Sequence, residues 1–522
     1  MSRIRPPHPP SITRFVLMSL VFVLGLLLCA SSIQAQASPG GQWRQDIRAY
    51  AQNLVDAGLS PGLSVAVVTG DRVADGFGVG LADMETNMPV DAGTRFYIAS
   101  SSKALTATAV VLMAAEGRID LQAPVTRYLP TLRFGEGIDA NDVTVHDLLA
   151  MTDGVSDAWP AVLRTAYSGE FTVPLLIDLF ADYGASEEGR AFDYSNLPYN
   201  LLGLVIDAVD DGEMAPDGWK TVVRSRVLDP LSMHEVTARP STLEADRIAM
   251  PHVLNGEGRF ERVRLAKADA NLHAAGGHFA SARSLARFVA MHIGLGQLEG
   301  QAIFDPEVIA ATHAEQARQD SQDFEYQRDG WGYGWDRALW GDERILQRFG
   351  GFTGYFSHMS FLPERGLGVV VLSNGRTRTP AAELLAGYIY ARLLEHENLD
   401  AHYAEALEAA REETAVLGQR IAQSLAERAE RLAPLPRPLS AYTGRFHNPA
   451  MGTMQWQAVA GGLEVWMGIA HARAEIFDAP QEQFRLTLTG GGSVAGFEFD
   501  EDGNVERLRW NGQDFLPIGG DH

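Results

Sequence analysis

Cysteine is almost absent from this chain. Its 522 residues include one cysteine, Cys29, which lies in an apolar stretch near the N-terminus. Because a disulfide needs two thiols and a thiolate zinc site needs several, the sequence excludes both. Once the N-terminal stretch is set aside, the chain also has no thiol that can act as a catalytic nucleophile.

Lysine is the second scarce residue. Lys103, Lys220 and Lys267 are the three lysines among 43 basic side chains, so arginine supplies nearly all of the positive charge. Arginine keeps its proton in proteins, whereas a buried lysine can lose it. A lysine close to a serine therefore indicates proton transfer rather than charge alone.

Positive charge is in deficit overall, with 66 acidic against 43 basic residues and a net charge of −23. This sign repels phosphate backbones and anionic lipid, so we expect no nucleic-acid partner.

The zinc-binding spacing H-E-x-x-H does not occur, and the His-x-Glu pair of His313 and Glu315 has no cysteines after it. We therefore expect neither a metal nor a cofactor.

Residues 1–37 have the pattern of a targeting segment. Three arginines precede the apolar run 15–29, which is shorter than the roughly 20 residues that a membrane-spanning helix needs. Ala35 and Ala37 follow at the spacing of a cleavage site. We expect a cleavable signal peptide and an exported protein, periplasmic or secreted, with no stable membrane span; the alternative is an uncleaved anchor.

The length and the hydrophobic pattern predict an α/β protein with more than one domain. Strand-like runs joined by turns occur near both ends of residues 38–397, from residue 63 and again over 355–374, with helical patterns between them. This order predicts one mainly antiparallel sheet, assembled from distant segments, with flanking helices and a helical insertion.

Two further parts follow in the chain. Residues 398–438 combine apolar residues at helical spacing with Pro434, Pro436 and Pro438, which indicates a helical and proline-rich linker. Residues 439–522 contain short strand-like runs between glycine clusters and a hairpin signal at Asp502-Gly503. This pattern predicts a small all-β domain.

The first candidate site is the S-x-x-K arrangement of Ser100 and Lys103, at the start of a helical run. Residues three apart share one helical face, so the amine can reach the hydroxyl. A serine hydroxyl needs an adjacent base, and an amine is a base only when burial or nearby positive charge lowers its pKa. Because such a pair also arises by chance, the spacing alone leaves the site open.

A second segment, Tyr194-Ser195-Asn196, places a phenol and an amide directly before an apolar helix. These groups suit a polar site beside Ser100. The alternative is that Ser195 or Asn196 only caps the helix.

A third segment, Arg348-Phe349-Gly350-Gly351, places successive glycines at a strand. Glycines there allow a ligand to approach the backbone, whose amides can stabilise an oxyanion. The alternative is a bulge or a tight turn.

In order and spacing these segments resemble serine β-lactamases, penicillin-binding proteins and their peptidase and esterase relatives. FYIASSSK looks like the family's nucleophile segment, VTVHDLLAMTDGV (143–155) like its H-D-L-L-x-x-T-x-G-V stretch, and YSN like its tyrosine motif. DPLSMHEV (229–236), AAGGHFASARSLARF (274–288) and LPERGLGVVVLSN also follow its pattern. The resemblance covers about residues 46–395, and the tail resembles the lipocalin-like or β-barrel domain appended to many such proteins.

The resemblance implies a role for each site residue. Ser100 would be the acylated nucleophile, and Lys103 and Tyr194 would share the proton transfer as general base and acid. Asn196 would hydrogen-bond the substrate or Lys103. The backbone amides of Ser100 and Gly351 would form the oxyanion hole.

The departure from the family pattern is Arg348, which with Gly350 belongs to the implied substrate-binding strand. The family has Lys or His at the position of Arg348. An arginine can bind a carboxylate and lower the pKa of the tyrosine, but it cannot shuttle a proton.

We therefore expect a serine hydrolase that forms a Ser100 acyl-enzyme with an ester, an amide or a lactam, and whose partner is a small-molecule or peptide substrate. Esterase, D-peptidase and β-lactamase-like activities stay open at this point, as does the oligomeric state. The alternative is a non-catalytic binding or scaffold protein that retains the fold.

Overall fold

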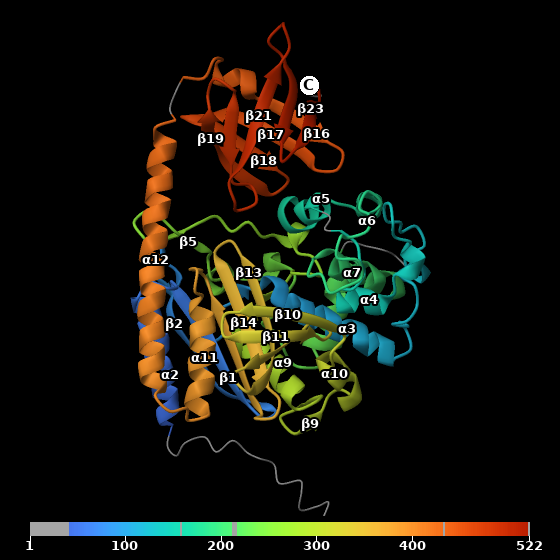
Figure 1. Ribbon diagram of the computed structural model, residues 1–522, viewed down its shortest axis with the longest axis vertical. Coiled ribbons are helices and arrows are strands. Elements are labelled where there is room, and N and C mark those ends of the chain that lie inside the picture. The colour runs from blue at the N-terminus through green and yellow to red at the C-terminus, as the bar shows by residue number, and fades with distance from the viewer. Residues whose placement is uncertain (1–40, 157–158, 211–216, 432–433, 520–522) are drawn as a thin grey trace, which may run out of the picture. The chain divides into compact units, whose positions relative to one another are not determined.

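The computed structural model describes residues 41–156, 159–210, 217–431 and 434–519 (Figure 1). The signal peptide expected at residues 1–37 lies outside these ranges. Within them, no helix is long and apolar enough to cross a membrane.

A nine-stranded antiparallel sheet lies at the centre of the larger part of the protein. It joins distant segments, because β1 pairs with β2 on one side and with β15 on the other. Side chains alternate across β1, so that Val65 and Val67 enter one core cluster and Ala66 and Val68 enter the other. In spatial order the strands are β10 (Ala317–Asp323), β11 (Tyr326–Trp331), β12 (Asp336–Trp340), β13 (Glu343–Phe352), β14 (Tyr355–Leu362), β15 (Leu367–Ser373), β1 (Gly62–Thr69), β2 (Arg72–Asp83) and β3 (Met88–Pro89).

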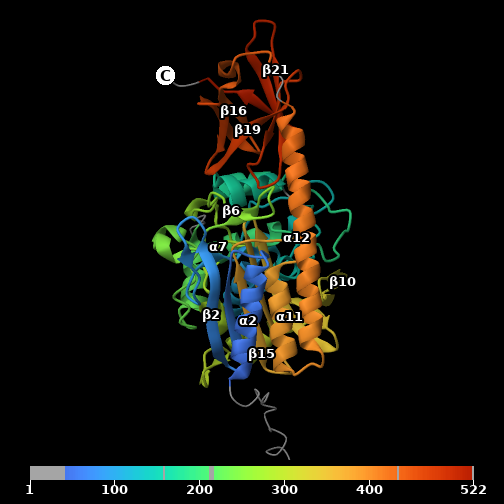
Figure 2. The same cartoon turned by 90° about the vertical axis from the view of Figure 1, so that its left-hand side faces the viewer.

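Helices cover both faces of the sheet. On one face α2 (Gln42–Asp56) and α11 (Ala381–Leu393) lie side by side (Figure 2), and their apolar side chains share a core cluster with the strands. On the other face α9 (Ala282–Ile293) packs against β1, β2 and β15. The strands β1 and β15 are almost wholly buried for this reason, which explains their continuous apolar sequences.

The helical insertion lies between the nucleophile segment and α9. Its helices are α3 (Ser102–Ala115), α4 (Val145–Ala150), α5 (Trp159–Val162), α6 (Val173–Phe180), α7 (Leu197–Asp210) and α8 (Gly218–Val223). The sequence sets their starts, since Thr144 forms a capping box with Asp147 at α4, and Thr172 caps α6. A π-helical segment, Leu163–Ser168, follows α5.

The segment expected as a linker contains one long helix, α12 (Leu399–Ala429). Its first half packs on the body of the protein, since Leu399, Tyr403 and Ala410 are buried in the same cluster as α2 and α11. The prolines that follow residue 433 lie after its end, as expected for residues that cannot continue a helix.

The C-terminal strands form a closed eight-stranded barrel. Closure comes from β16 and β23, where Phe446 lies opposite Pro517. Aromatic side chains, among them Trp456, Phe484 and Phe497, fill the interior. The strands are β16 (Gly444–Asn448), β17 (Gly452–Val459), β18 (Gly462–Met467), β19 (Ala470–Asp478), β20 (Gln483–Leu486), β21 (Ser493–Phe499), β22 (Val505–Trp510) and β23 (Gln513–Pro517).

The expected fold class is therefore confirmed. A mainly antiparallel sheet is flanked by helices and carries a helical insertion, and a small all-β domain follows it. The insertion and the sheet meet where β13 passes the turn that precedes α3, and the candidate residues gather there.

Candidate active site

A tight turn presents Ser100 at the surface of the site. β4 (Phe96–Tyr97) leads into a 3-10 turn, Ala99–Ser101, and then directly into α3. Ala99 has a φ of 44°, a left-handed conformation that costs a non-glycine residue about 1–3 kcal/mol. The turn leaves Ser100 partly exposed, whereas Ser101 and Ser102 are 0% exposed.

The two buried serines fix the turn. The Oγ atoms of Ser101 and Ser357 are 2.9 Å apart, and the Ser102 Oγ accepts a hydrogen bond from the amide of His278. Of the serine run, Ser100 therefore has the hydroxyl that a substrate can reach.

The amine of Lys103 is fully buried beneath Ser100. Its Nζ donates to the Ser100 Oγ at 3.4 Å, to the Asn196 Oδ1 at 2.7 Å and to the backbone oxygen of Ala275 at 2.9 Å. All three acceptors are neutral oxygens. Burial lowers the pKa of Lys103, and the positive charge of Arg348 lowers it further, against an opposing effect of Tyr194.

Asn196 both stands at the start of a helix and contacts the lysine amine, the two roles considered from the sequence. It directly precedes α7, and its backbone oxygen accepts from the amide of Asn200, as at a helix start. Its side-chain oxygen meanwhile accepts from Lys103. The tyrosine loop before it is anchored on α4, because the Asp193 amide donates to the backbone oxygen of Met151.

Tyr194 lies over the same amine, with the Lys103 Nζ 5.0 Å from its ring centroid. The side chain is 40% exposed, so it borders the opening of the site. Its hydroxyl accepts a hydrogen bond from the Arg348 Nη2 at 2.8 Å. Desolvation raises the pKa of Tyr194, but the charges of Arg348 and Lys103 outweigh that effect and hold the pKa below its ordinary value.

Arg348 is an internal cation. Its guanidinium is 1% exposed, and its Nη1 donates to the Asp336 Oδ2 at 2.7 Å, so that a buried ion pair stands beside Tyr194. A substrate carboxylate has little access to such a group. The structure thus places Arg348 where it lowers the pKa of the tyrosine rather than where it meets a ligand.

Asp336 is a residue that the sequence did not identify as part of the site. It begins β12 and follows residues 331–335, in which three aromatic residues alternate with glycines. The available signal was the arginine itself, since a buried guanidinium requires a counter-ion. The sequence did not indicate which carboxylate that would be.

The two glycines of β13 differ in what surrounds them. A Cβ at Gly350 would overlap the backbone oxygen of Ile98 and lie 2.9 Å from the Ser100 nitrogen, so this position must be glycine for the strand to lie against the nucleophile. A Cβ at Gly351 would meet the Arg376 Nη1, the end of a flexible side chain, at 2.9 Å.

The strand β13 continues beyond its neighbour β12 at this point. The β12–β13 pairing runs from Trp340 opposite Glu343 to Asp336 opposite Gln347, and residues 348–352 extend past it. This part of β13 is where a substrate can lie alongside the backbone.

Away from the candidate site, a serine, a histidine and a carboxylate occur together in the core. The His358 Nε2 is 2.6 Å from the Ser360 Oγ, and its Nδ1 is 2.9 Å from the Glu383 Oε2. These residues are at most 4% exposed and hold β14 against α11. Because a substrate cannot reach these side chains, they do not form an active site despite their short mutual contacts.

Among the described residues, no group of three or more His, Cys, Asp or Glu side chains is arranged to hold a metal ion. The His273 Nδ1 donates to the Asn200 Oδ1 at 2.9 Å, and the histidine is buried. Its partner is an amide, as for a histidine that supports the core.

The sequence model of one protein family, described as Beta-lactamase, matches residues 47–393, more than half of the chain. The chain belongs to the beta-lactamase family. The match spans every site residue discussed above, and it confirms the resemblance drawn from the motifs. Family membership points to activity of the serine hydrolase type.

Individual relatives are distant. Protein flp of Staphylococcus aureus (strain MW2) is 25% identical over 213 residues, 41% of this chain and 42% of that protein, so the match spans about two fifths of its length. Penicillin-binding protein 4 of Amycolatopsis lactamdurans is 26% identical over 327 residues, 61% of this chain and 82% of that protein. The solved octameric penicillin-binding protein homologue from Pyrococcus abyssi has a TM-score of 0.55 at 20% identity, covers 91% of this chain and 99% of its own, and shows the fold.

Proposed function

We propose that this beta-lactamase family member is a hydrolase that forms an acyl-enzyme on Ser100. The observation that supports the proposal most is the environment of Lys103. Its amine is fully buried, hydrogen-bonds neutral oxygens and lies 3.4 Å from the reachable hydroxyl of the serine run. A lysine in such an environment can be unprotonated and can accept a proton.

In the first step the neutral Lys103 takes the proton of the Ser100 hydroxyl, and the Oγ attacks the carbonyl carbon of an ester, amide or lactam. The negative oxygen that forms would be stabilised by the backbone amides of Ser100 and Gly351, the groups at the contact of β13 with the turn. As the bond to the leaving group breaks, the proton passes from Lys103 through Tyr194 to that group. Water then attacks the acyl-enzyme, and the reverse transfer restores Ser100.

Arg348 supports these proton transfers by lowering the pKa of Tyr194. A phenol with an ordinary pKa gives up its proton poorly at neutral pH. The guanidinium 2.8 Å from the hydroxyl favours the phenolate and so brings the pKa closer to that of the amine. Asp336 keeps the guanidinium in place.

Covalent labelling tests this proposal. Incubation with a fluorophosphonate probe should add one label per chain, seen by intact-mass spectrometry, and Ser100→Ala should remove it. Ser360→Ala is the matched control: it should keep the label and lose about 1–3 kcal/mol of stability by thermal unfolding, because it breaks the buried histidine contact. A label that persists in Ser100→Ala would contradict the assignment.

The rival function is binding without turnover. It would be supported if neither a fluorophosphonate nor a penicillin labelled the protein. If labelling occurs, rates on nitrocefin, short p-nitrophenyl esters and D-Ala-D-Ala peptides distinguish the three substrate classes, and we favour an ester or peptide substrate.

A further inference from the structure

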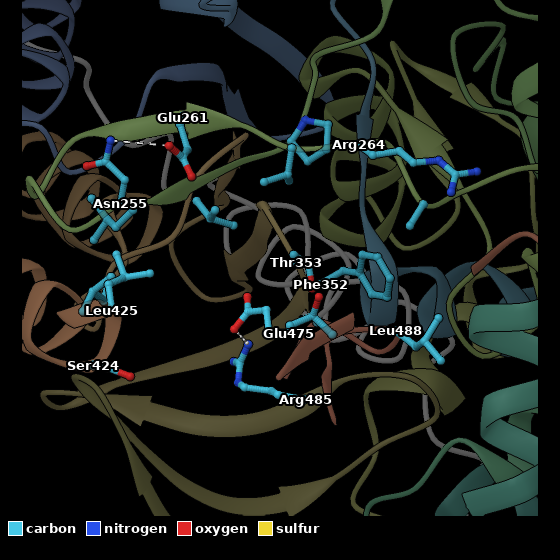
Figure 3. A pocket seen from close by; sticks show the side chains of 18 of the residues that line it. Asn255, Glu261, Arg264, Phe352, Thr353, Ser424, Leu425, Glu475, Arg485 and Leu488 are labelled. Carbon is cyan, nitrogen blue, oxygen red and sulfur yellow. Dashed lines mark hydrogen bonds and ion pairs between the residues drawn. The ribbon is translucent and has the colours of Figure 1, made fainter. Parts of the chain in front are cut away.

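A pocket of about 810 Å³ opens at the end of β13, where Phe352 and Thr353 line it (Figure 3). Most of its walls come from four segments of the chain: residues 251–266, the turn after β13, the second half of α12, and the barrel strands β19 and β20 with the loop that follows. Phe352 and Leu488 give it apolar surface, and several charged side chains border it.

The pocket continues the strand that lies against the nucleophile. Gly350 is in contact with the Ser100 backbone, and Phe352 and Thr353 line the pocket. A strand advances about 3.3 Å per residue, so the pocket begins roughly 10 Å or less from Ser100. A substrate that lies along residues 348–352 therefore reaches it.

The walls are packed together rather than loosely apposed. A Cβ at Gly490 of the barrel would overlap the Thr353 hydroxyl. A Cβ at Gly256 would lie 3.1 Å from the Leu425 Cδ1 of α12. The pocket is thus a built cavity with the barrel loop as one wall.

The charge of the pocket is opposite to that of the chain. Four arginines and two glutamates line it, on a protein whose net charge is −23. Glu475 is already paired, with the Nη1 atoms of Arg428 at 3.1 Å and Arg485 at 3.6 Å. Glu261 contacts the Asn255 amide, as the close-up shows (Figure 3).

Two arginines of the pocket have no side-chain partner among the described residues. Arg264 and Arg420 border the pocket, and neither makes a hydrogen bond or an ion pair with another side chain in the described part of the protein. Most arginines here do pair with a carboxylate. Two free guanidinium groups in one pocket of an acidic protein favour an anionic ligand, and their planar fork matches a carboxylate.

We infer that this pocket binds the end of the substrate remote from the reacting carbonyl, and that this end carries a carboxylate attracted by Arg264 and Arg420, which are exposed and unpaired among the described residues. The inference rests on the proposed function of Ser100. It assigns the substrate to extended acids, such as a peptide or acyl chain with a terminal carboxylate. It also assigns the barrel and α12 a part in substrate selection.

A matched pair of esters tests this inference on the full chain. Mono-p-nitrophenyl suberate has a carboxylate at the end of an extended chain that can pass from Ser100 toward the pocket, and its methyl ester is the neutral counterpart. We expect the double variant Arg264→Gln, Arg420→Gln to lower the ratio of kcat/KM for the acid over the neutral ester about tenfold. Arg445→Gln, which changes an exposed barrel arginine outside the pocket, should leave the ratio unchanged.

The outcomes separate the two proposals. If the neutral ester acylates Ser100 but the ratio is the same in the wild type and the double variant, the pocket assignment is overturned and the hydrolase is not. Calorimetric titration with suberate itself needs no turnover, and the double variant should weaken binding about tenfold. Unchanged suberate affinity would overturn the pocket assignment even if the protein hydrolysed neither ester.

Discussion

Lys103→Arg is expected to lower the rate of Ser100 acylation about 10³-fold, the size of a general-base contribution, in a protein that still folds. The substitution keeps the positive charge and removes the basicity, because a guanidinium does not lose its proton. Stopped-flow labelling with the fluorophosphonate measures the rate, and thermal unfolding measures the fold.

Two further variants make this result interpretable. Lys103→Met has a similar length and no charge, so it should lose acylation as well, even if arginine is too large for a fully buried position. Lys220→Arg changes another buried lysine, whose Nζ donates to the backbone oxygen of Asp269 outside the site, and should acylate at the normal rate. An active Lys103→Met protein would rule out the amine as the base.

Gly350→Ala is expected to reduce acylation about 10²-fold, the cost of misplacing reacting groups by about 1 Å. The added Cβ would overlap a backbone oxygen at Ile98 and press on the Ser100 nitrogen, and backbone atoms cannot rotate away. β13 and the nucleophile turn must therefore separate. Overpacking of this kind also costs about 1–3 kcal/mol, which chemical denaturation measures.

Gly351→Ala is the paired control for that experiment. The nearest atom to its Cβ is the end of the Arg376 side chain, which is exposed and can move. The substitution keeps the backbone amide, so acylation should fall much less than for Gly350→Ala. Equal effects at the two positions would show that the close approach of Gly350 to the turn is not what limits the site.

Much of the sheet could be predicted from the sequence. The strands at both ends of residues 38–397 carry continuous apolar runs, and Gly70-Asp71 and Glu364-Arg365-Gly366 supply their turns. These are local signals. The order of strand-like and helical runs predicts one sheet built from both ends of this range. The pairing of β1 with β15, about 300 residues later in the chain, and its register needed the structure.

Closure of the barrel was implied by the resemblance of the tail to a lipocalin-like domain, but not by its local sequence pattern. The sequence of residues 439–522 shows short strands and turns, which suit an open or a closed sheet equally well. Closure depends on the pairing of Phe446 with Pro517, at opposite ends of the domain, and no local pattern reports that contact.

The motif residues of the candidate site were predicted from the sequence, but the backbone contact that holds the lysine amine was not. Ser100, Lys103, Tyr194 and Asn196 come together as the motifs implied. The backbone oxygen of Ala275 on the amine could not be foreseen, because any residue type supplies such an oxygen.

The most direct measurement is the titration of Lys103 itself. With three lysines in the chain, ¹³Cε-lysine labelling gives three NMR signals, which Lys103→Arg and Lys267→Met assign. Burial also lowers the pKa of Lys267, to about 7, so assignment by variants is essential. The structure predicts that the Lys103 amine loses its proton below the ordinary lysine value of about 10.4, and that acylation of Ser100 rises through the same pH range. A Lys103 signal that titrates at or above that value would mean that the amine is not the base proposed here.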